Sequence, residues 1–345
     1  MKIAIIADPY FPVPPKMYGG TERVIFNLRL GLQERGHSVT LFGSGDSSVP
    51  CNLIACCPTH YNSEVEGVRA EMIENARQQN YFNILDQQSN FDVIHWHAGL
   101  DPTLLDLRTP VLITPHIPYD RFELTHEQDR KNICELPHSS ASNKYQENFP
   151  GPNYVGTVYH GVDYELIPFQ PKPGTYLSFV GRFSPEKQPH LALRFAIEMG
   201  QPIVVAGKID LQHQDYYDSM CKPLLHHPLV TNYGEVSEIK RNKIFGGASV
   251  NLHCIDVEET FGLTVVEAGL TGTPTIAFNR GSMPELIEHG KSGLLARDYS
   301  ELSGLLNQAK SLDRAVVRKH FEQFSIRKMT DGYLRLYEMI SQVYN

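Results

Sequence analysis

Residues 249–278 read SVNLHCIDVEETFGLTVVEAGLTGTPTIAF, and this stretch decides the class of fold. The run Ser249–His253 has the composition of a buried strand, and a loop follows it up to Gly262. Residues Leu263–Thr271 have helical spacing, and Thr275–Phe278 is again a short apolar run. A strand, a helix and a second strand in this order predict a parallel sheet covered by helices.

The same alternation extends outward from this stretch in both directions. We expect further strands at Lys2–Asp8, Ser38–Phe42, Asn52–Cys56, Asp92–Trp96, Val111–Thr114, Tyr154–Tyr159, Tyr176–Val180, Ile203–Ala206 and Val230–Tyr233, with helical segments between most of them. Pro168, Pro171, Pro173 and Gly174 interrupt the pattern and have the composition of a linker.

The sequence therefore predicts an α/β protein with two doubly wound parallel-sheet domains, residues 1–168 and 169–324. It leaves open whether a C-terminal helix at about 325–345 packs back on the first domain. Open parallel sheets bind ligands beyond the carboxyl ends of their strands, so we expect the two domains to face a cleft.

Composition excludes several classes of protein. The 345 residues carry a formal net charge of −8, with residues 1–168 contributing −8 and the remainder zero, so the first half offers no basic surface to nucleic acid. The six cysteines contain no C-x-x-C pair, and no apolar run is long enough for a signal peptide or a membrane span. We therefore expect a cytoplasmic protein without an integral membrane segment.

The strongest motif lies in the loop and helix between Glu258 and Ala268. Glu259 and Glu267 are separated by seven residues that include Phe261, Gly262 and Leu263. Taken alone, the two Glu are explained as well by a structural role as by a functional one, with one at a helix N-terminus and the other exposed two turns later. With Phe-Gly-Leu between them, they resemble the signature of retaining glycosyltransferases of the GT-B architecture, family four, also called group one.

The residue types in this motif suit the binding of a nucleotide sugar. Gly262 allows the backbone to approach a ligand, and the first N–H groups of a helix attract phosphate. The resemblance implies that Phe261, Gly262 and Leu263 line the donor site. It also implies that Glu267 accepts hydrogen bonds from the nucleotide ribose and that Glu259 faces the donor sugar.

A second motif, Phe179 to Lys187, resembles the G-R-x-x-x-x-K segment of the same family. Arg182 offers a planar bidentate donor and Lys187 a compact charge, which together suit a diphosphate leaving group. Outside that context both would be solvated surface residues. The family usually has Gly after this Lys, whereas this chain has Gln188, which puts the local turn in doubt.

Further matches lie in the first half of the chain. Gly19 and Gly20 precede the first helix, where the family's loop contacts the diphosphate, although two glycines alone would be an ordinary turn. His95-Trp96-His97 resembles the family's H-x-H strand, and His116 corresponds to a histidine near the donor sugar. His95 and His97 share one face of a strand, so a metal pair is conceivable, but no D-x-D motif accompanies them.

Two more positions are assigned by resemblance alone. His160 stands at the Asn of the family's N-G-V-D turn, and Val236 lies where the family's backbone contacts the nucleotide base. The segment from Ile117 to Pro150 is short and polar where relatives commonly have more structure around the acceptor. The base, the sugar, the acceptor and the oligomeric state therefore stay open.

The sequence predicts a retaining glycosyltransferase of hexosyltransferase type that uses a nucleotide-diphosphate sugar, needs no metal or other cofactor and serves carbohydrate biosynthesis. His116, Glu259, Arg182 and Lys187 are the expected catalytic residues, in a GT-B fold of two Rossmann-like domains. The unknown acceptor is a glycan, a lipid-linked molecule or a small molecule. The alternatives are a nucleotide-sugar 2-epimerase, a sugar phosphorylase, or an inert nucleotide-sugar-binding protein.

Overall fold

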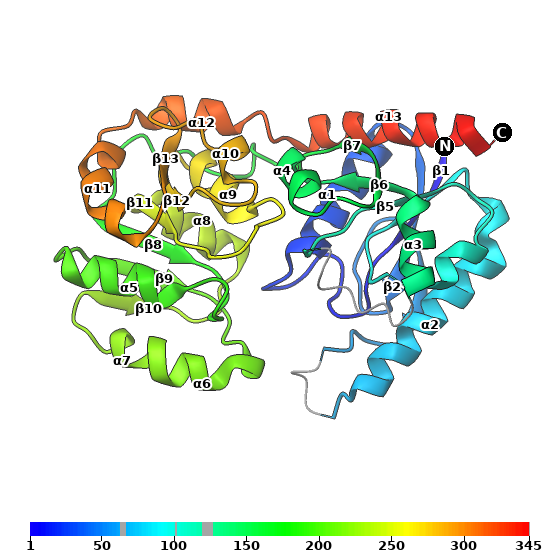
Figure 1. The fold of residues 1–345 in the computed structure, drawn as a ribbon, viewed down its shortest axis with the longest axis horizontal. Coiled ribbons are helices and arrows are strands. Elements are labelled where there is room, and N and C mark those ends of the chain that lie inside the picture. Colours follow the sequence, from blue (N-terminus) through cyan, green and yellow to red (C-terminus); the bar gives the residue numbers. More distant parts are fainter. Residues whose placement is uncertain (63–66, 101, 119–126, 345) are drawn as a thin grey trace. The chain divides into compact units, whose positions relative to one another are not determined.

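A computed structural model describes residues 1–62, 67–100, 102–118 and 127–344. The chain forms two compact units, the first made of Met1–Gly161 with Ile326–Asn345 and the second of Val162–Ser325 (Figure 1). The division thus falls between residues 161 and 162 rather than at the predicted residue 168. Among the described residues, no helix is both long and apolar enough to cross a membrane.

The first unit is built on a seven-stranded parallel sheet in the order β3-β2-β1-β4-β5-β6-β7. Its strands are β1 (Lys2–Ile6), β2 (Ser38–Ser44), β3 (Asn52–Cys57), β4 (Val93–Trp96), β5 (Val111–Ile113), β6 (Pro137–Ser140) and β7 (Asn153–Thr157). Its helices are α1 (Gly20–Glu34), α2 (Ala70–Gln87), α3 (Glu127–Glu135), α4 (Asn143–Asn148) and α13 (Ile326–Tyr344). The central strands are buried on both faces, which explains why β1 is an almost unbroken apolar run.

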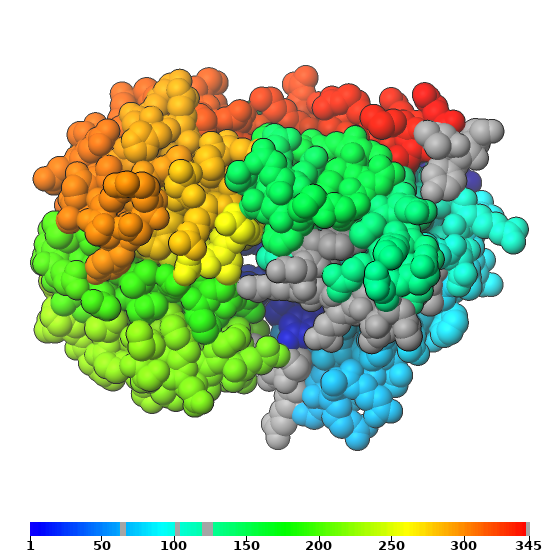
Figure 2. All heavy atoms as spheres, in the orientation of Figure 1, coloured from blue at the N-terminus to red at the C-terminus, as the bar shows by residue number. Residues whose placement is uncertain are grey.

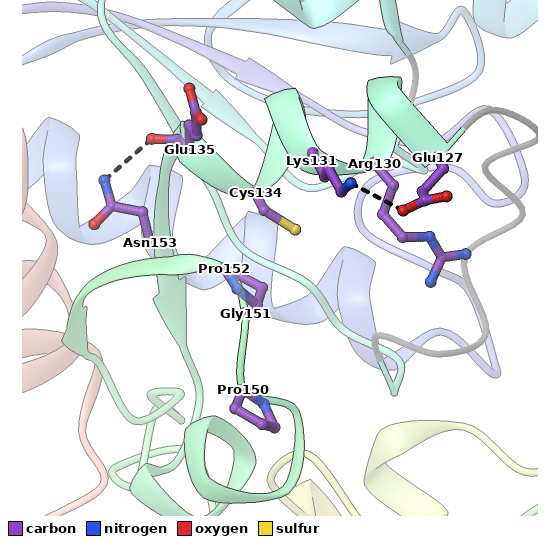
Figure 3. A pocket seen from close by; sticks show the side chains of 9 residues that line it. All are labelled: Glu127, Arg130, Lys131, Cys134, Glu135, Pro150, Gly151, Pro152 and Asn153. Atoms are coloured by element: carbon purple, nitrogen blue, oxygen red, sulfur yellow. Dashed lines mark hydrogen bonds and ion pairs between the residues drawn. The ribbon is translucent and has the colours of Figure 1, made fainter.

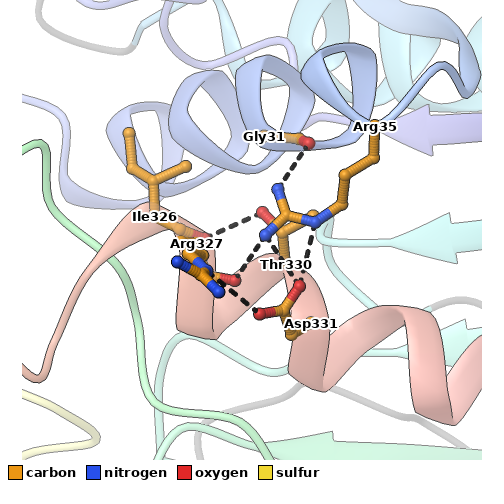
Figure 4. Close-up of polar contacts among 6 residues, drawn as sticks. All are labelled: Gly31, Arg35, Ile326, Arg327, Thr330 and Asp331. Atoms are coloured by element: carbon orange, nitrogen blue, oxygen red, sulfur yellow. Dashed lines mark hydrogen bonds and ion pairs between the residues drawn. The ribbon is translucent and has the colours of Figure 1, made fainter.

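Helix α13 belongs to the first unit because it packs closely along α1 (Figure 4). Arg35 donates from Nε and Nη2 to Oδ1 of Asp331 at 2.9 and 2.7 Å, and from Nη1 to the Gly31 carbonyl at 3.0 Å. A Cβ atom at Gly31 would lie 2.0 Å from Oγ1 of Thr330, so the two helix backbones approach as they do only because residue 31 is glycine.

The second unit has a six-stranded parallel sheet in the order β10-β9-β8-β11-β12-β13. Its strands are β8 (Tyr176–Val180), β9 (Ile203–Ala206), β10 (Val230–Asn232), β11 (Ala248–His253), β12 (Thr275–Phe278) and β13 (Gly293–Ala296). Its helices are α5 (Pro189–Glu198), α6 (Gln214–Tyr216), α7 (Lys222–Leu225), α8 (Glu238–Gly246), α9 (Leu263–Leu270), α10 (Met283–Leu286), α11 (Leu302–Lys310) and α12 (Arg314–Phe321).

Both sheets are parallel and carry helices, so the predicted class of two doubly wound domains is confirmed. Apolar side chains fill the core of each unit. Figure 2 shows the outer atoms that enclose these cores, coloured along the chain. The strands β6 and β13 were not predicted. Each has only four residues, and β6 reads Pro-His-Ser-Ser, without the apolar run that identifies a buried strand.

Candidate functional site

In the second unit, the predicted site residues follow strands that lie side by side at the centre of the sheet. Arg182 and Lys187 follow β8, and Glu259 follows β11, the parallel neighbour of β8. The connections after these two strands lead to opposite halves of the sheet, because β9 lies on one side of β8 and β12 lies beyond β11. This reversal of strand order is where open α/β sheets bind ligands.

Gly262 makes the turn from this edge of the sheet into α9. Its φ is +105°, a conformation that favours glycine, and a Cβ atom there would lie 2.6 Å from Cε of Met283, so that side chain would have to move. The first hydrogen bonds of the helix run from the N–H groups of Val265 and Val266 to the Gly262 carbonyl. The amides of Leu263 and Thr264 precede these bonds, as the first amides of a helix do.

Lys187 and Glu259, 72 residues apart, are brought into direct contact: Nζ of Lys187 donates to Oε2 of Glu259. Burial of the Glu259 carboxyl acts to raise its pKa, but the charge of Lys187, the electrostatic effects of His253 and Arg182 and the Lys187 hydrogen bond lower it overall. Glu259 is therefore ionised at neutral pH, and its carboxylate balances the charge of Lys187.

Arg182 is held by two carboxylates that the sequence analysis did not identify. Its Nη2 donates to Oε1 of Glu186 at 2.7 Å, and its Nη1 lies 3.3 Å from Oδ2 of Asp210, which follows β9. Glu186 lies inside the recognised motif, whereas Asp210 carries no local sequence signal. The two acids fix the guanidinium at the same edge of the sheet as Lys187.

His253, the last residue of β11, is a further member of this group that sequence reasoning missed. It is buried, and burial lowers the pKa of its imidazole to about 4, so the ring is neutral at pH 7. Among the described residues its Nε2 has no hydrogen-bond partner. A histidine at a strand end was the only signal available in the sequence.

Glu267 lies inside α9 and is almost completely buried. Both of its oxygens accept from Arg241 of α8, Oε2 from Nε and Oε1 from Nη2, each at 2.8 Å. Arg241 was not identified from the sequence. A carboxylate has about four lone-pair positions, so Glu267 can accept from other donors besides a bidentate arginine.

The other predicted donor-site residues differ in exposure. Phe261 is buried against Phe324, with ring centroids 5.8 Å apart, and its role is therefore in packing as well as in any contact with a ligand. Val236, between β10 and α8, is half-buried and packs on the cluster of Val204, Ala206 and Ile244. Leu263 is half-buried at the first position of α9.

In the first unit, Gly19 and Gly20 form the entry to α1 after strand β1. Gly19 has φ +148°, and a Cβ atom there would lie 2.5 Å from Cβ of Pro15 and 2.9 Å from Oε2 of Glu22. Burial raises the pKa of Glu22 to about 8, with Asp8 adding to the effect, so this carboxyl is protonated at neutral pH. The glycine turn is thus packed directly on an uncharged Glu22.

The predicted histidines of the first unit form a continuous row with His160. The ring centroids of His95 and His97 are 3.9 Å apart, those of His97 and His116 are 5.1 Å apart, and those of His116 and His160 are 5.1 Å apart. We call these four residues the histidine row. His95 is bonded to the hydroxyls of Tyr337 and Thr114, at 2.6 and 2.7 Å, which makes it a satisfied core histidine.

Within the described parts of the chain, no group of three or more His, Cys, Asp or Glu side chains could hold a metal ion.

A pocket in the first unit lies apart from all of these residues. It runs along α3 and the loop that leads into β7 (Figure 3), and it is lined by Glu127, Arg130, Lys131, Cys134, Glu135, Pro150, Gly151, Pro152 and Asn153. These residues fall within the segment Ile117–Pro150 and just after it, of which residues 119–126 lie outside the described residues. None of the predicted site residues is among the nine.

Comparison with known proteins gives matches along most of the chain. Residues 18–166 match the model described as Glycosyltransferase Family 4, and residues 167–323 match the model described as Glycosyl transferases group 1. The two matches adjoin and follow the order of the two units. Among curated proteins, YtcC of Bacillus subtilis, named as a candidate glycosyltransferase, is 25% identical over 96% of this chain and 86% of its own.

Solved structures share the fold at low sequence identity. Sucrose-phosphate synthase from Thermosynechococcus elongatus matches with a TM-score of 0.77 and 18% identity, over 99% of each chain. HepE of Anabaena, solved in complex with UDP-glucose, matches with a TM-score of 0.75 and 16% identity, over 98% of this chain and all of its own. These similarities show that the two parallel-sheet units make up a GT-B fold.

Proposed function

The chain belongs to family four of the glycosyltransferases, also called group one, and we propose that it is a retaining enzyme that moves a sugar from a nucleotide-diphosphate sugar to an acceptor hydroxyl. One observation carries the proposal: Arg182, Lys187, Glu259 and the start of α9 meet where the strand order of the second sheet reverses. We assign the donor to the second unit and the acceptor to the first.

The reaction breaks the bond between the anomeric carbon and the diphosphate oxygen and forms a bond from that carbon to the acceptor oxygen. Retention follows if the acceptor attacks from the face that the diphosphate leaves, and the leaving phosphate oxygen takes the proton of the acceptor hydroxyl. Negative charge grows on the diphosphate, so fixed cations and helix amides near it lower the barrier. We assign this role to Arg182, Lys187 and the first amides of α9.

The existing ion pairs are compatible with that role. An ammonium has three N–H donors and a guanidinium five, so bonds to carboxylates and to phosphate can coexist. Glu259 holds Lys187 in place, and its own ionised carboxylate can accept a hydroxyl of the sugar. Glu267, fixed by Arg241, is proposed to accept the ribose hydroxyls.

The proposal includes independence from metal, because Arg182 and Lys187 supply the positive charge that a divalent cation would otherwise bring to the diphosphate. Turnover should be equal in EDTA and in added Mg²⁺. Loss of turnover in EDTA with recovery on adding the metal would contradict this part of the proposal. We further propose that the reaction takes place in the cytoplasm, as the cysteine spacing favours.

The first experiment is calorimetric titration with UDP, GDP and ADP and with the matching nucleosides, starting with UDP because HepE was solved with UDP-glucose. For the nucleotide that binds, Lys187→Ala should lower the affinity for the diphosphate by about tenfold or more, as expected for the loss of a charged hydrogen bond. The affinity for the matching nucleoside should stay nearly unchanged. Lys222→Ala is the matched control, because Lys222 also pairs with a carboxylate, that of Asp218, but on the exposed helix α7. Equal losses for diphosphate and nucleoside would remove Lys187 from the phosphate site.

The second experiment identifies the reaction. The binding nucleotide is supplied as its glucose, galactose and mannose conjugates, and the anomeric configuration of the product is read by NMR. Transfer with retention supports the proposal. Inversion would contradict it, and an epimerised nucleotide sugar without transfer would favour the 2-epimerase instead.

A further inference from the structure

The histidine row sits at the carboxyl ends of three strands of the first sheet. His95 lies in β4 and His97 directly follows it, His116 follows the adjacent strand β5, and His160 follows β7, two strands further along the sheet. His95, His97 and His160 are buried, while His116 is half-buried. His116 is therefore the member of the row that a ligand can reach, and the other three surround it or lie behind it.

Burial keeps all four rings uncharged at neutral pH. It lowers the pKa of His116 to about 4 and those of His95, His97 and His160 well below the ordinary value for histidine, and the rings also disfavour each other's protonation. A neutral imidazole has one N–H donor and one bare acceptor nitrogen, so each ring must place its single proton on one of two atoms.

The hydrogen bond between His97 and His116 restricts that choice. Nδ1 of His97 lies 2.8 Å from Nε2 of His116, so one of these two atoms carries a proton and the other does not. Within the described residues, the remaining nitrogen of His97, Nε2, has no hydrogen-bond partner. If His116 donated, the proton of His97 would sit on this Nε2, as a buried N–H without an acceptor.

Buried N–H groups without an acceptor are rarer in proteins than acceptors without a donor, and an unmet donor costs free energy. The favoured arrangement therefore has His97 donating from Nδ1 and His116 accepting at Nε2. The single proton of His116 is then on Nδ1.

We propose that His97 and His160 are positioning residues that hold His116 as its neutral Nδ1–H tautomer in one orientation. His97 sets the tautomer through its hydrogen bond. His160 sets the plane of the ring, because the two imidazoles are stacked at an interplanar angle of 25°.

The tautomer decides what His116 can do for a ligand. With its proton on Nδ1, it approaches a sugar hydroxyl as a hydrogen-bond donor rather than as a base. This consequence rests on the proposed function, whereas the tautomer itself is a property of the protein without substrate.

The test is a long-range ¹H–¹⁵N NMR spectrum of the whole chain labelled with ¹⁵N-histidine, which distinguishes protonated from bare ring nitrogens. Loss of a signal set in His116→Gln assigns the ring. In the parent, His116 should be protonated at Nδ1 and bare at Nε2, although an isolated imidazole side chain prefers the reverse. His97→Leu should shift His116 toward Nε2–H, and His97→Asn, whose amide nitrogen can donate from the place of Nδ1, should restore Nδ1–H.

A parent spectrum with His116 protonated at Nε2 would overturn the inference, and this result requires only that the assignment variant His116→Gln folds. An unchanged Nδ1–H signature in a folded His97→Leu would overturn the role of His97. For His160, replacement by Leu should lower turnover by about tenfold, the scale of a lost ring stack, while replacement by Phe, which keeps a flat ring, should restore most of it. Equal turnover in the two variants would remove His160 from the positioning role.

The two proposals can fail separately. A chain with His116 in the Nδ1–H form that transfers no sugar from any donor would contradict the proposed function and leave the positioning of His116 intact. A chain that transfers sugar with His116 in the Nε2–H form would do the opposite.

Discussion

Arg241 and Glu267 form a buried, bidentate ion pair that joins α8 to α9, with Nε and Nη2 of the arginine each 2.8 Å from a carboxylate oxygen. Side-chain exposures of 6% and 3% show that water reaches neither partner to any extent. The residue assigned to the ribose is therefore also a structural residue of the second unit. This double role changes which substitutions can test it.

Glu267→Ala should destabilise the second unit by about 3–5 kcal/mol, because it leaves the Arg241 guanidinium buried and uncompensated. Replacing both residues by Met should recover most of that loss, since a well-packed apolar pair avoids the desolvation of two charges. Urea denaturation of the parent, the two single variants and the double variant measures the coupling. Glu147→Ala, which breaks the exposed pair with Lys144, is the control. A double variant as unstable as the sum of the single variants would show that the pair is not coupled.

Glu259→Gln should lower turnover of the intact donor by about a hundredfold, the scale of an interaction made mainly in the transition state. Affinity for the product nucleotide diphosphate should change by less than about tenfold, and in the direction of tighter binding, because Lys187 loses the carboxylate that balances its charge.

Steady-state kinetics and calorimetric titration of the same preparation measure both quantities. Glu301→Gln, in the exposed pair with Arg297, is the matched control. Product affinity and turnover that fall in equal proportion would place Glu259 in the nucleotide pocket instead of beside the sugar.

Gln188→Gly should stabilise the protein by about 0.5–1 kcal/mol. Gln188 has φ +46° and ψ +47° at the start of α5, which is a left-handed conformation. This conformation costs an L residue about 1–2 kcal/mol, whereas glycine adopts it freely. Part of this gain is offset because glycine loses more conformational entropy on folding. Thermal and urea unfolding measure the change. Gln188→Ala keeps the unfavourable φ and loses the hydrogen bond to Asp256, so it should give no gain. Stabilisation by Ala as well as by Gly would mean that backbone strain is not the cause.

Acid should destabilise the first unit through its buried histidines. Burial lowers the pKa of His138 to about 4, so as pH falls below the ordinary histidine value of about 6.5 the unfolded chain binds a proton before the folded one does. Stability is then lost between about pH 6.5 and pH 4, at about 1.4 kcal/mol per pH unit for each such histidine.

His138→Asn removes one of these groups and keeps a donor for the Leu136 carbonyl, which Nδ1 contacts at 2.7 Å. Urea denaturation at several pH values measures how the free energy of unfolding depends on pH. In this range the dependence should be weaker than in the parent by the amount that corresponds to about one proton. His226→Asn, at an exposed position, controls for the chemical change. A slope unchanged in His138→Asn would mean that His138 does not resist protonation in the fold.

The sequence by itself determined the features that depend on neighbouring residues. The alternation of apolar strands and helices predicted both sheets, and Gly262 was identified at a turn whose φ of +105° favours glycine. It also placed Arg182, Lys187 and Glu259 at the ends of strands, which parallel topology gathers at one edge. Strand β6 escaped prediction because four residues of mixed polarity carry too little pattern.

Only the tertiary structure decided which side chains meet. Four pairs of partners come from separate elements, and no spacing in the sequence relates them: Lys187 with Glu259, Arg182 with Asp210, Glu267 with Arg241, and His116 with His160. The return of α13 to α1, at Gly31, likewise joins the two ends of the chain. Spacing along a chain reports the local periods of helix and strand, whereas the partner of a buried charge or ring depends on the order of strands and on the packing of helices over them.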